Sequence, residues 1–483
     1  MHYEFADTLT ARDFKRHIPH SFQVPENCTG LSIRFHYAPP RVGDFRNMLT
    51  LTLFDSQGFR GAGHRHGDTH EVTLRSATGT AHASASPGYR PGALPAGEWT
   101  VQIDTHMILP NPDAGPECPY TLTVDAEVDT SLDIAVHDDE STGVPEDRDD
   151  APRFDFVANS APGWYRGDLH AHTFHSDAAW DVPDLAAAAR ALGLDFVTLT
   201  DHNTTTPLAQ FAELTGPDLL TMGGMELTTF WGHAVCLGAT EWVDWRVDAA
   251  GEAMNRIAEA QYAAGNLFVI AHPQSEGDPF CTGCRWVFPH MRPGCARYVE
   301  VWNGRWGNTD PRTQNEGSLG LWYDWLNQGL RLTATAGSDA HGPAHYGEGV
   351  GFNVIYAQSL SQAGILDGLR TGRTYLSAGA TLEFSAQDGS GARAEIGEAL
   401  PVAAHGSTDG DKAAITLRAA WADAPPGAEL RLIRNGETID ARPVDARGAT
   451  DWTLAVEPGQ WVVLELRRAD GWMWGLTNPI FFE

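Results

Sequence analysis

The first 136 residues alternate short apolar runs with polar turns. The runs include "LSIRFHYAP", "NMLTLTLFD" and "GEWTVQIDTH", which are rich in β-branched and aromatic residues, and Gly, Pro and Asp separate them. Short runs of this kind, without helical periodicity, predict β-strands. We therefore expect an N-terminal β-sandwich over residues 1–136.

An acidic segment follows at residues 137–154. Most of it reads "HDDESTGVPEDRDDAP" and contains almost no apolar residues. A segment of this composition cannot bury enough apolar surface to fold. It predicts an exposed linker.

The pattern changes over residues 155–378, where apolar runs alternate with segments of helical periodicity. "DVPDLAAAARALGL" predicts a helix with Asp181 as its N-cap. Two further helices are expected to end at Gly265 and Gly372. Alternation of strands and helices indicates an α/β fold with parallel strands, in an open sheet or a barrel.

Residues 379–483 return to alternating β-patterns, such as "AELRLIRNGETI" and "QWVVLELRRADG". The "RNGE" stretch is typical of a two-residue hairpin turn. We expect a C-terminal β-sandwich over these residues.

The composition narrows the class of protein. A chain of 483 residues is long enough for about three domains. Its formal net charge of −30 argues against a nucleic-acid surface, which needs a basic stripe. No apolar run reaches the ~18 residues of a membrane span, and the first residues lack the apolar core of a secretory signal. We expect a cytoplasmic protein with no nucleic-acid or membrane partner.

The polar residues of the central region gather where apolar runs end. In a barrel of parallel strands, the carboxyl ends of the strands converge on one mouth. Imidazoles and carboxylates from five runs would meet there. The residues at these strand ends are His170, His172, Asp201, His202, Glu226, His272, Asp339 and His341.

Two pairs in this set have a spacing that suits a metal ion. Side chains at i and i+2 of a strand project to one face, so His170 and His172 can hold one ion together, and Asp339 and His341 repeat the geometry. Imidazole and carboxylate without thiolate suit Zn, Mn or Fe. The set is large enough for two or three divalent ions if Glu226 bridges them.

Other residues near these motifs have weaker signals. His175 is expected to face away from His170 and His172, and Glu300 is expected to support a ligand instead of binding an ion. His290 and His345 lie in predicted loops, where they are possible substrate contacts, and Arg285 or Arg305 could clamp a phosphate.

The loop cysteines allow two interpretations. Cys281, Cys284 and Cys295 have the content of a separate structural zinc site, although their spacing is irregular. The alternative is a set of reduced loop thiols.

The ordered motifs "DLHAHTFHSD", "TDHN", "GGMEL", "AHP" and "GSDAH" resemble those of the polymerase and histidinol phosphatase (PHP) superfamily over residues 155–378. The flanking β-regions and the final "TNPIFF" resemble its carbaryl-hydrolase-like (CehA/McbA) branch. The resemblance implies a distorted (β/α)7 barrel flanked by the two β-sandwich domains.

The resemblance also implies a ligand set for each ion. It assigns the first ion to His170, His172, Glu226 and Asp339. It assigns the second ion to Glu226, His233 and His272. It assigns the third ion to Asp177, His202 and His341. His233 and Asp177 are included on the resemblance alone.

These expectations favour a metal-dependent phosphoesterase that uses a metal-bridging hydroxide on a small phosphate ester, with Asp201, His202 and Glu226 as catalytic residues. Asp201 would orient His202 or relay a proton. The same centre could hydrolyse a carboxylic ester or a carbamate, for which aromatic stretches such as "EVWNGRW" and "GLWYDWL" would line an apolar mouth. A third hypothesis is a non-catalytic metal-binding or scaffold protein. The expected partner is a small-molecule substrate, and the oligomeric state is not predicted.

Overall fold

The computed structural model describes residues 1–77, 82–110, 117–129, 152–307, 314–402 and 413–483. Most of the predicted linker, residues 137–151, lies outside the described residues. Among the helices of the described residues, none is long and apolar enough to cross a membrane.

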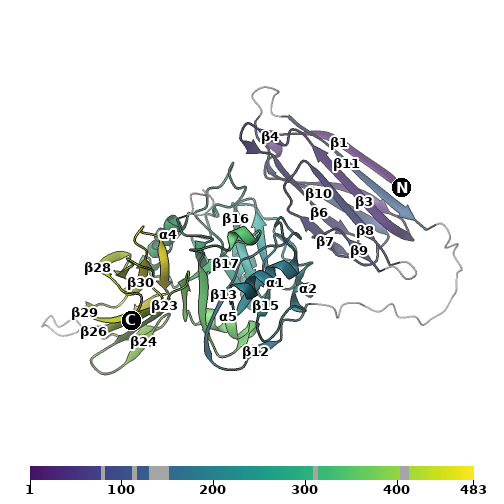
Figure 1. Cartoon of the computed structure of the whole chain (residues 1–483). Coiled ribbons are helices and arrows are strands. Elements are labelled where there is room, and N and C mark those ends of the chain that lie inside the picture. Colours follow the sequence, from purple (N-terminus) through teal and green to yellow (C-terminus); the bar gives the residue numbers. More distant parts are fainter. Residues whose placement is uncertain (78–81, 111–116, 130–151, 308–313, 403–412) are drawn as a thin grey trace.

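The N-terminal region forms two antiparallel sheets around one apolar core, as the alternating runs predict (Figure 1). The sheets have the strand orders β1-β11-β3-β8-β9 and β2-β10-β6-β7, and β4 pairs with β5 in a separate hairpin. The strands are β1 (His2–Thr10), β2 (His17–Val24), β3 (Cys28–Tyr37), β4 (Arg41–Val42), β5 (Phe45–Arg46), β6 (Met48–Asp55), β7 (Gly58–Gly63), β8 (Thr69–Arg75), β9 (Ser84–Ala85), β10 (Gly97–Met107) and β11 (Glu117–Val128). A 3₁₀ turn at Ala11–Asp13 follows β1.

The central region contains a curved run of seven strands. They are β13 (Gly163–Asp168), β14 (Phe196–Leu199), β15 (Leu220–Thr229), β16 (Gly232–Leu237), β17 (Leu267–Ile270), β18 (Tyr298–Asn303) and β19 (Thr333–Gly337). They pair in chain order, and a parallel bridge between Ala171 and Ala340 links the two ends of the run. Short β12 (Val157–Asn159) pairs with β21 (Leu360–Ser361).

Within the described part of the chain, five α-helices accompany these strands: α1 (Val182–Ala191), α2 (Leu208–Ala212), α3 (Ala253–Ala263), α4 (Asn315–Asn327) and α5 (Gln362–Arg370). The predicted cap of α1 is confirmed, because Asp181 and Asp184 form a capping box. Gly265 and Gly372 have φ of 82° and 72°, the left-handed conformation that ends a helix.

The predicted parallel pairing is confirmed from β13 to β15 and from β17 to β19, but it is wrong in the middle of the run. β16 is antiparallel to both β15 and β17, because β15 and β16 form a tight hairpin. No helix lies between β17 and β18 among the described residues. The regular strand–helix repeat of a (β/α)7 barrel is therefore not shown, although the region is a strand-rich α/β structure.

The C-terminal region extends the central sheet. Strands β20 (Phe352–Ala357) and β22 (Thr374–Ser377) join β13 to β31 (Met473–Thr477), β30 (Trp461–Arg467), β27 (Glu429–Arg434) and β28 (Glu437–Pro443). A second sheet covers the same core. It consists of β24 (Arg393–Glu395), β23 (Thr381–Gln387), β26 (Ala413–Ala422) and β29 (Gly448–Val456), while β25 (Ala399–Leu400) pairs with β32 (Ile480–Phe482). Asn435 and Gly436 form the predicted hairpin turn, with φ of 52° and 82°.

The N-terminal sheets rest against the mouth of the central region (Figure 1). Lys15 Nζ lies 2.7 Å from Asp278 Oδ2, and Arg65 Nη2 donates to the Phe174 carbonyl at 2.7 Å. The His17 ring stacks on Phe230 with 4.8 Å between ring centroids. These contacts join residues far apart in the sequence and hold the N-terminal region against the central region.

Candidate metal centre

The central strands bring most of the predicted site residues together at one end. His170 and His172 follow β13, and His202 follows β14 with its backbone bridged to Glu226 of β15. His272 follows β17. The remaining members of the cluster are His233 on β16, Asp339 and His341 after β19, and Asp177 in the turn after His172.

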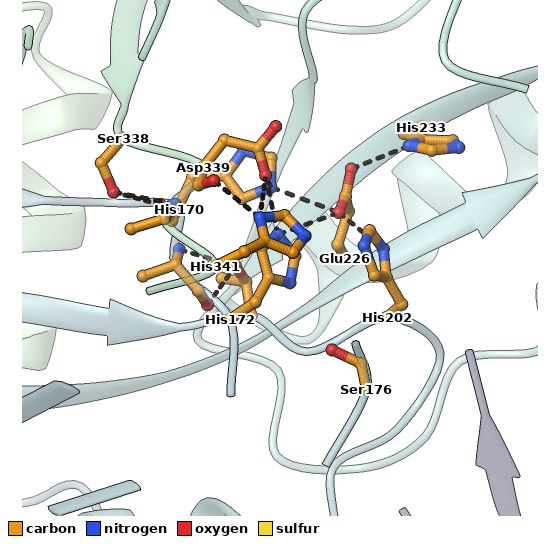
Figure 2. A network of polar contacts seen from close by, with 12 residues as sticks. His170, His172, Ser176, His202, Glu226, His233, Ser338, Asp339 and His341 are labelled. Carbon is orange, nitrogen blue, oxygen red and sulfur yellow. Dashed lines mark hydrogen bonds and ion pairs between the residues drawn. The ribbon is translucent and has the colours of Figure 1, made fainter. Parts of the chain in front are cut away.

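Glu226 lies at the centre of this cluster (Figure 2). Its Oε2 atom is 3.2 Å from His170 Nε2, 3.4 Å from His172 Nε2 and 2.8 Å from His202 Nδ1. Its Oε1 atom is 3.0 Å from His233 Nδ1 and 3.2 Å from His272 Nε2. All six side chains are buried, so one carboxylate contacts five imidazoles away from water.

Three groups in the cluster have ligand atoms within 4.8 Å of one another. The groups are His170, His172, Glu226 and Asp339; His202, Glu226 and His233; and His172, Asp177, His202 and His341. The first group has the same members as the set expected for the first ion. The other two differ from the expected sets in one respect: His202 stands in place of His272 in the second group, and His172 is added to the third.

The cluster fits metal ions because several buried ligand atoms have no hydrogen bond, even where another ligand atom lies within ion-pair distance. His170 Nε2, Glu226 Oε2 and His233 Nε2 have no hydrogen bond of acceptable geometry among the described residues. A buried polar atom without a partner is costly. His170 Nδ1 lies 3.0 Å from Glu300 Oε1, which is the usual arrangement of a metal-binding histidine whose other nitrogen is held by a carboxylate. Glu300 therefore has the supporting position that the sequence suggested.

Two of these residues have a strained backbone. Asp339 has φ of 51° and His272 has φ of 29°, values that residues other than glycine rarely adopt. His272 N donates to Glu300 Oε2 at 3.0 Å, and Asp339 N donates to the His170 carbonyl at 2.8 Å. The surrounding hydrogen bonds thus hold both residues in the conformation that turns them into the cluster.

The pKa values of the cluster's side chains are shifted in both directions. Burial opposes charge on His341, but the neighbouring Asp177 outweighs it and raises the His341 pKa to about 10. Burial favours a neutral Asp177, but His341 and His202 hold its pKa well below the ordinary value. Burial, followed by the nearby His202 and His341, lowers the pKa of His172 to about 3. Its neutral ring keeps a lone pair that can bind a cation.

Asp201 has a different place from the one predicted. Thr173 N and Ser176 Oγ donate to Asp201 Oδ1 at 2.7 and 2.6 Å, and Thr173 Oγ1 donates to Oδ2 at 2.5 Å. The structure gives it no hydrogen bond to His202 among the described residues. Burial raises the Asp201 pKa to about 6. Asp201 therefore holds the turn that carries Asp177, and its predicted catalytic contact with His202 is not present.

The residues predicted to touch substrate lie outside the cavity that opens on the cluster. Arg285 is exposed and donates to Gln274, and the Arg305 guanidinium lies over the Trp472 ring. His345 is exposed, with its ring 5.8 Å from that of His341, and His290 faces Glu252. None of the four is among the residues that line the cavity, so the structure gives no support to these assignments, which stay predictions.

His175 also lies outside the metal cluster. Gly88 N donates to its Nδ1 at 3.4 Å, and Thr206 Oγ1 is 3.3 Å from the same atom. It contacts the N-terminal region, in agreement with the expectation that it faces away from His170 and His172.

A cavity of about 450 Å³ leads from the cluster to the surface. The N-terminal region lines it with Arg41, Asp44, Phe45, Arg46, Met48, His64 and His66. His66 Nε2 lies 3.5 Å from Asp177 Oδ2, and the His64 and His202 rings are 4.5 Å apart. We did not predict this wall. The "GHRHG" stretch, with histidines at i and i+2 after a strand, was the signal that could have identified it.

Of the two interpretations of the loop cysteines, the structural zinc site is not formed among the described residues. Cys281 and Cys284 form a disulfide, and the Cys295 thiol donates to the Asn255 carbonyl. No thiol belongs to a metal-compatible group among the described residues. The three cysteines therefore do not converge, and the reduced-thiol alternative holds only for Cys295.

Part of the predicted aromatic mouth is core. Trp322 and Trp325 of α4, together with Trp302 and Trp306, are buried in the core shared by the central and C-terminal strands. The cavity wall contains none of these four.

Comparisons with known proteins find only remote structural likeness. No model of a protein family matches the chain, and no curated protein matches it. A two-domain protein from Bacteroides vulgatus containing a predicted PHP-like metal-dependent phosphoesterase has a TM-score of 0.37 and 16% identity, over 66% of this chain and 96% of that chain. A putative metal-dependent phosphoesterase from Bifidobacterium adolescentis has a TM-score of 0.28 and 18% identity, over 38% and 91%.

An amidohydrolase from Chromobacterium violaceum with bound sulfate and no metal has a TM-score of 0.25 and 18% identity, over 38% of this chain and 89% of that chain. At these TM-scores the likeness carries no argument about function. The functional proposal therefore depends on the buried cluster itself.

Proposed function

We propose that the chain is a multinuclear metal-dependent hydrolase that acts on a small phosphate ester. The observation that carries the proposal is the single buried carboxylate of Glu226 in contact with five imidazoles, beside two further carboxylates. A core that serves only stability rarely contains so many buried polar atoms without a hydrogen bond. We further infer a PHP-type phosphoesterase of the carbaryl-hydrolase-like branch, because five motifs occur in the expected order.

The donor set suits two or three Zn, Mn or Fe ions. His170, His172, Glu226 and Asp339 would hold the first. Glu226 and His233, with His202 or His272, would hold the second. Asp177, His202 and His341 would hold the third. Bound divalent ions lower the pKa of water and neutralise negative charge on ester oxygens.

The chain's own residues define where the substrate enters. The side chains of Asp339 and His341 are 26% and 27% exposed, whereas that of Glu226 is fully buried. A substrate in the cavity therefore meets Asp339 and His341 first, with Glu226 beneath them. Glu300, under His170, keeps the imidazole orientation fixed while the substrate exchanges.

The test is turnover by metal-loaded protein of nitrophenyl phosphate, bis(nitrophenyl) phosphate and a panel of natural phosphomonoesters. We expect turnover of at least one phosphate ester, and we expect Glu226→Gln to lower kcat/KM by ~100-fold or more, the scale of a lost transition-state electrostatic contact. His290→Gln is the control, because that exposed histidine lies outside the cavity. If the metal-loaded protein hydrolyses no ester of the panel, the proposal of a phosphoesterase is refuted.

A carboxylic-ester or carbamate hydrolase is the second candidate. The outer cavity wall contains Phe45, Met48 and Phe280, which would suit an apolar aryl group. Naphthyl carbamate compared with nitrophenyl phosphate separates the two candidates. A higher kcat/KM for the carbamate would favour the second.

A further inference from the structure

The cavity above the cluster has two walls from distant parts of the sequence. One wall comes from the loop between β17 and β18, including Phe280 and the Cys281–Cys284 disulfide. The other comes from the N-terminal region, chiefly the β4–β5 hairpin. The cavity is therefore complete only when the N-terminal region is in place.

The two walls are held together by specific contacts. Phe45 of the hairpin and Phe280 of the loop pack edge to face, with 5.3 Å between ring centroids. Lys15 Nζ lies 2.7 Å from Asp278 Oδ2 next to the same loop, and only 9% of the Lys15 side chain is exposed. Thr204 Oγ1, in the central region, donates to the Gly88 carbonyl of the N-terminal region at 3.1 Å. The hairpin consequently has a fixed position above the metal cluster.

The hairpin carries two exposed arginines. Arg41 and Arg46 are directly opposite each other in the β4–β5 register, where like charges repel. Neither guanidinium lies within ion-pair distance of a carboxylate among the described residues; Arg41 donates only to the Asp44 carbonyl at 2.8 Å. The Asp44 carboxylate is the one acidic group of the hairpin in the cavity wall. Two opposed cations at the mouth of a cavity indicate an anionic ligand.

Part of the cavity wall is apolar. Phe45, Met48, Pro279, Phe280 and the disulfide form it. A ligand that fills the cavity can therefore contact this apolar and partly aromatic section as well as Arg41 and Arg46. This section favours a ring over a polar chain.

We propose that the N-terminal β4–β5 hairpin is the specificity element of the site, and that it selects esters whose aromatic leaving group carries an anionic substituent. The proposal rests on the proposed function, since the scissile ester would sit at the metal cluster. Phe45 and Phe280 contact the ring, and Arg41 and Arg46 bind the distal anion. The N-terminal region is thus part of the substrate site as well as a neighbouring domain.

The test compares two non-hydrolysable ligands, phenylphosphonate and 4-carboxyphenylphosphonate. Their affinities for metal-loaded full-length protein are measured by calorimetry. We expect the carboxylated ligand to bind ~10-fold more tightly, the effect of one charge-assisted hydrogen bond at a partly exposed site. Arg41→Gln with Arg46→Gln should abolish this preference, so that the double variant binds the two phosphonates with equal affinity.

Arg12→Gln is the matched control, because Arg12 is an exposed arginine of the same region outside the cavity wall. Circular dichroism of each variant shows whether it folds, and Phe45→Leu supplies a second variant that should weaken both ligands without changing their ratio. Equal affinities of the wild-type protein for the two phosphonates, or no binding of either, would overturn the proposal. A preference that persists in the double variant would overturn it as well.

The two phosphate esters that correspond to these phosphonates separate this inference from the proposed function. Turnover of phenyl phosphate and 4-carboxyphenyl phosphate is measured in parallel. Preferential phosphonate binding with no turnover of any ester would refute the hydrolase and support the hairpin as a specificity element. Turnover of both esters at equal kcat/KM, with equal phosphonate affinities, would support the hydrolase and refute the role of the hairpin.

Discussion

Individual ligands were the most predictable part of the site. His170 and His172 could be identified because i and i+2 positions share a face and because both follow a strand. His233 lies inside β16, where no strand-end signal marks it, so only the resemblance to known motifs included it. His66 comes from a separate region, and its approach to Asp177 depends on domain packing that local pattern does not encode.

Glu300 gives a direct test of how the cluster is supported. Glu300→Gln keeps the shape of the side chain but removes the negative charge that holds His170 Nδ1 and the His272 backbone N–H. We expect metal affinity to fall ~10- to 100-fold, the usual effect of removing such a supporting contact. Competition titration against a chelator measures it.

The exposed Glu383→Gln on β23 is the control for that titration. An unchanged metal affinity in a folded Glu300→Gln protein would mean that His170 does not need this carboxylate.

His70 gives a pH test away from the cluster. Burial lowers its pKa to about 4, whereas the unfolded residue titrates near ~6.5. Between these two values the unfolded state therefore binds more protons than the folded state. The free energy of unfolding rises as the pH rises through this window, and the protein becomes less stable as the pH falls through it. The total effect is at most about 3 kcal/mol.

Urea unfolding across this pH window should show a flatter pH dependence in His70→Gln than in the wild-type protein. His36→Gln, at an exposed position on the paired strand, is the control. An identical slope in wild-type and His70→Gln proteins would count against a neutral buried His70.

The elements divide into those with local signals and those without. α1 was predictable because its capping box is formed by two residues close in the sequence, Asp181 and Asp184. α4 was not, because Gln314 makes no side-chain cap and the helix is specified by burial of Trp322 and Trp325 against distant strands. The antiparallel β16 was missed because a hairpin and a crossover both begin with a buried strand.

The turn at Gly88 is an element that couples the N-terminal sheets to the metal region. Gly88 has φ of 90°, and a Cβ there would lie 2.4 Å from the Ala62 carbonyl oxygen and 2.7 Å from that of His175. We expect Gly88→Ala to lower the free energy of unfolding by ~2 kcal/mol more than the strain of positive φ alone would. We also expect it to increase hydrogen exchange around His175.

Gly92→Ala is the matched control. It also has positive φ, at 128°, but the nearest atom to its Cβ would be Arg60 Nη2 at 3.9 Å. Thermal unfolding and hydrogen exchange of both variants provide the measurement. Equal effects of the two substitutions would show that the contact with His175 is unimportant.

At the scale of the whole molecule, the sequence indicated β-rich regions on either side of an α/β region. It did not indicate that the C-terminal strands continue the central sheet, because strand pairing across about 100 residues has no local signature. Nor did it indicate that the N-terminal sheets line the cavity. Both features depend on long-range packing, and the second carries the proposed substrate selection.

The most direct test of the metal centre is elemental analysis of the purified full-length protein under metal-replete conditions. The three metal-compatible groups around Glu226 predict about two to three divalent ions per chain, drawn from Zn, Mn and Fe. Glu226→Gln should lose more than one ion, because its carboxylate belongs to two of the groups. Fewer than one ion per chain in the wild-type protein would contradict a multinuclear centre.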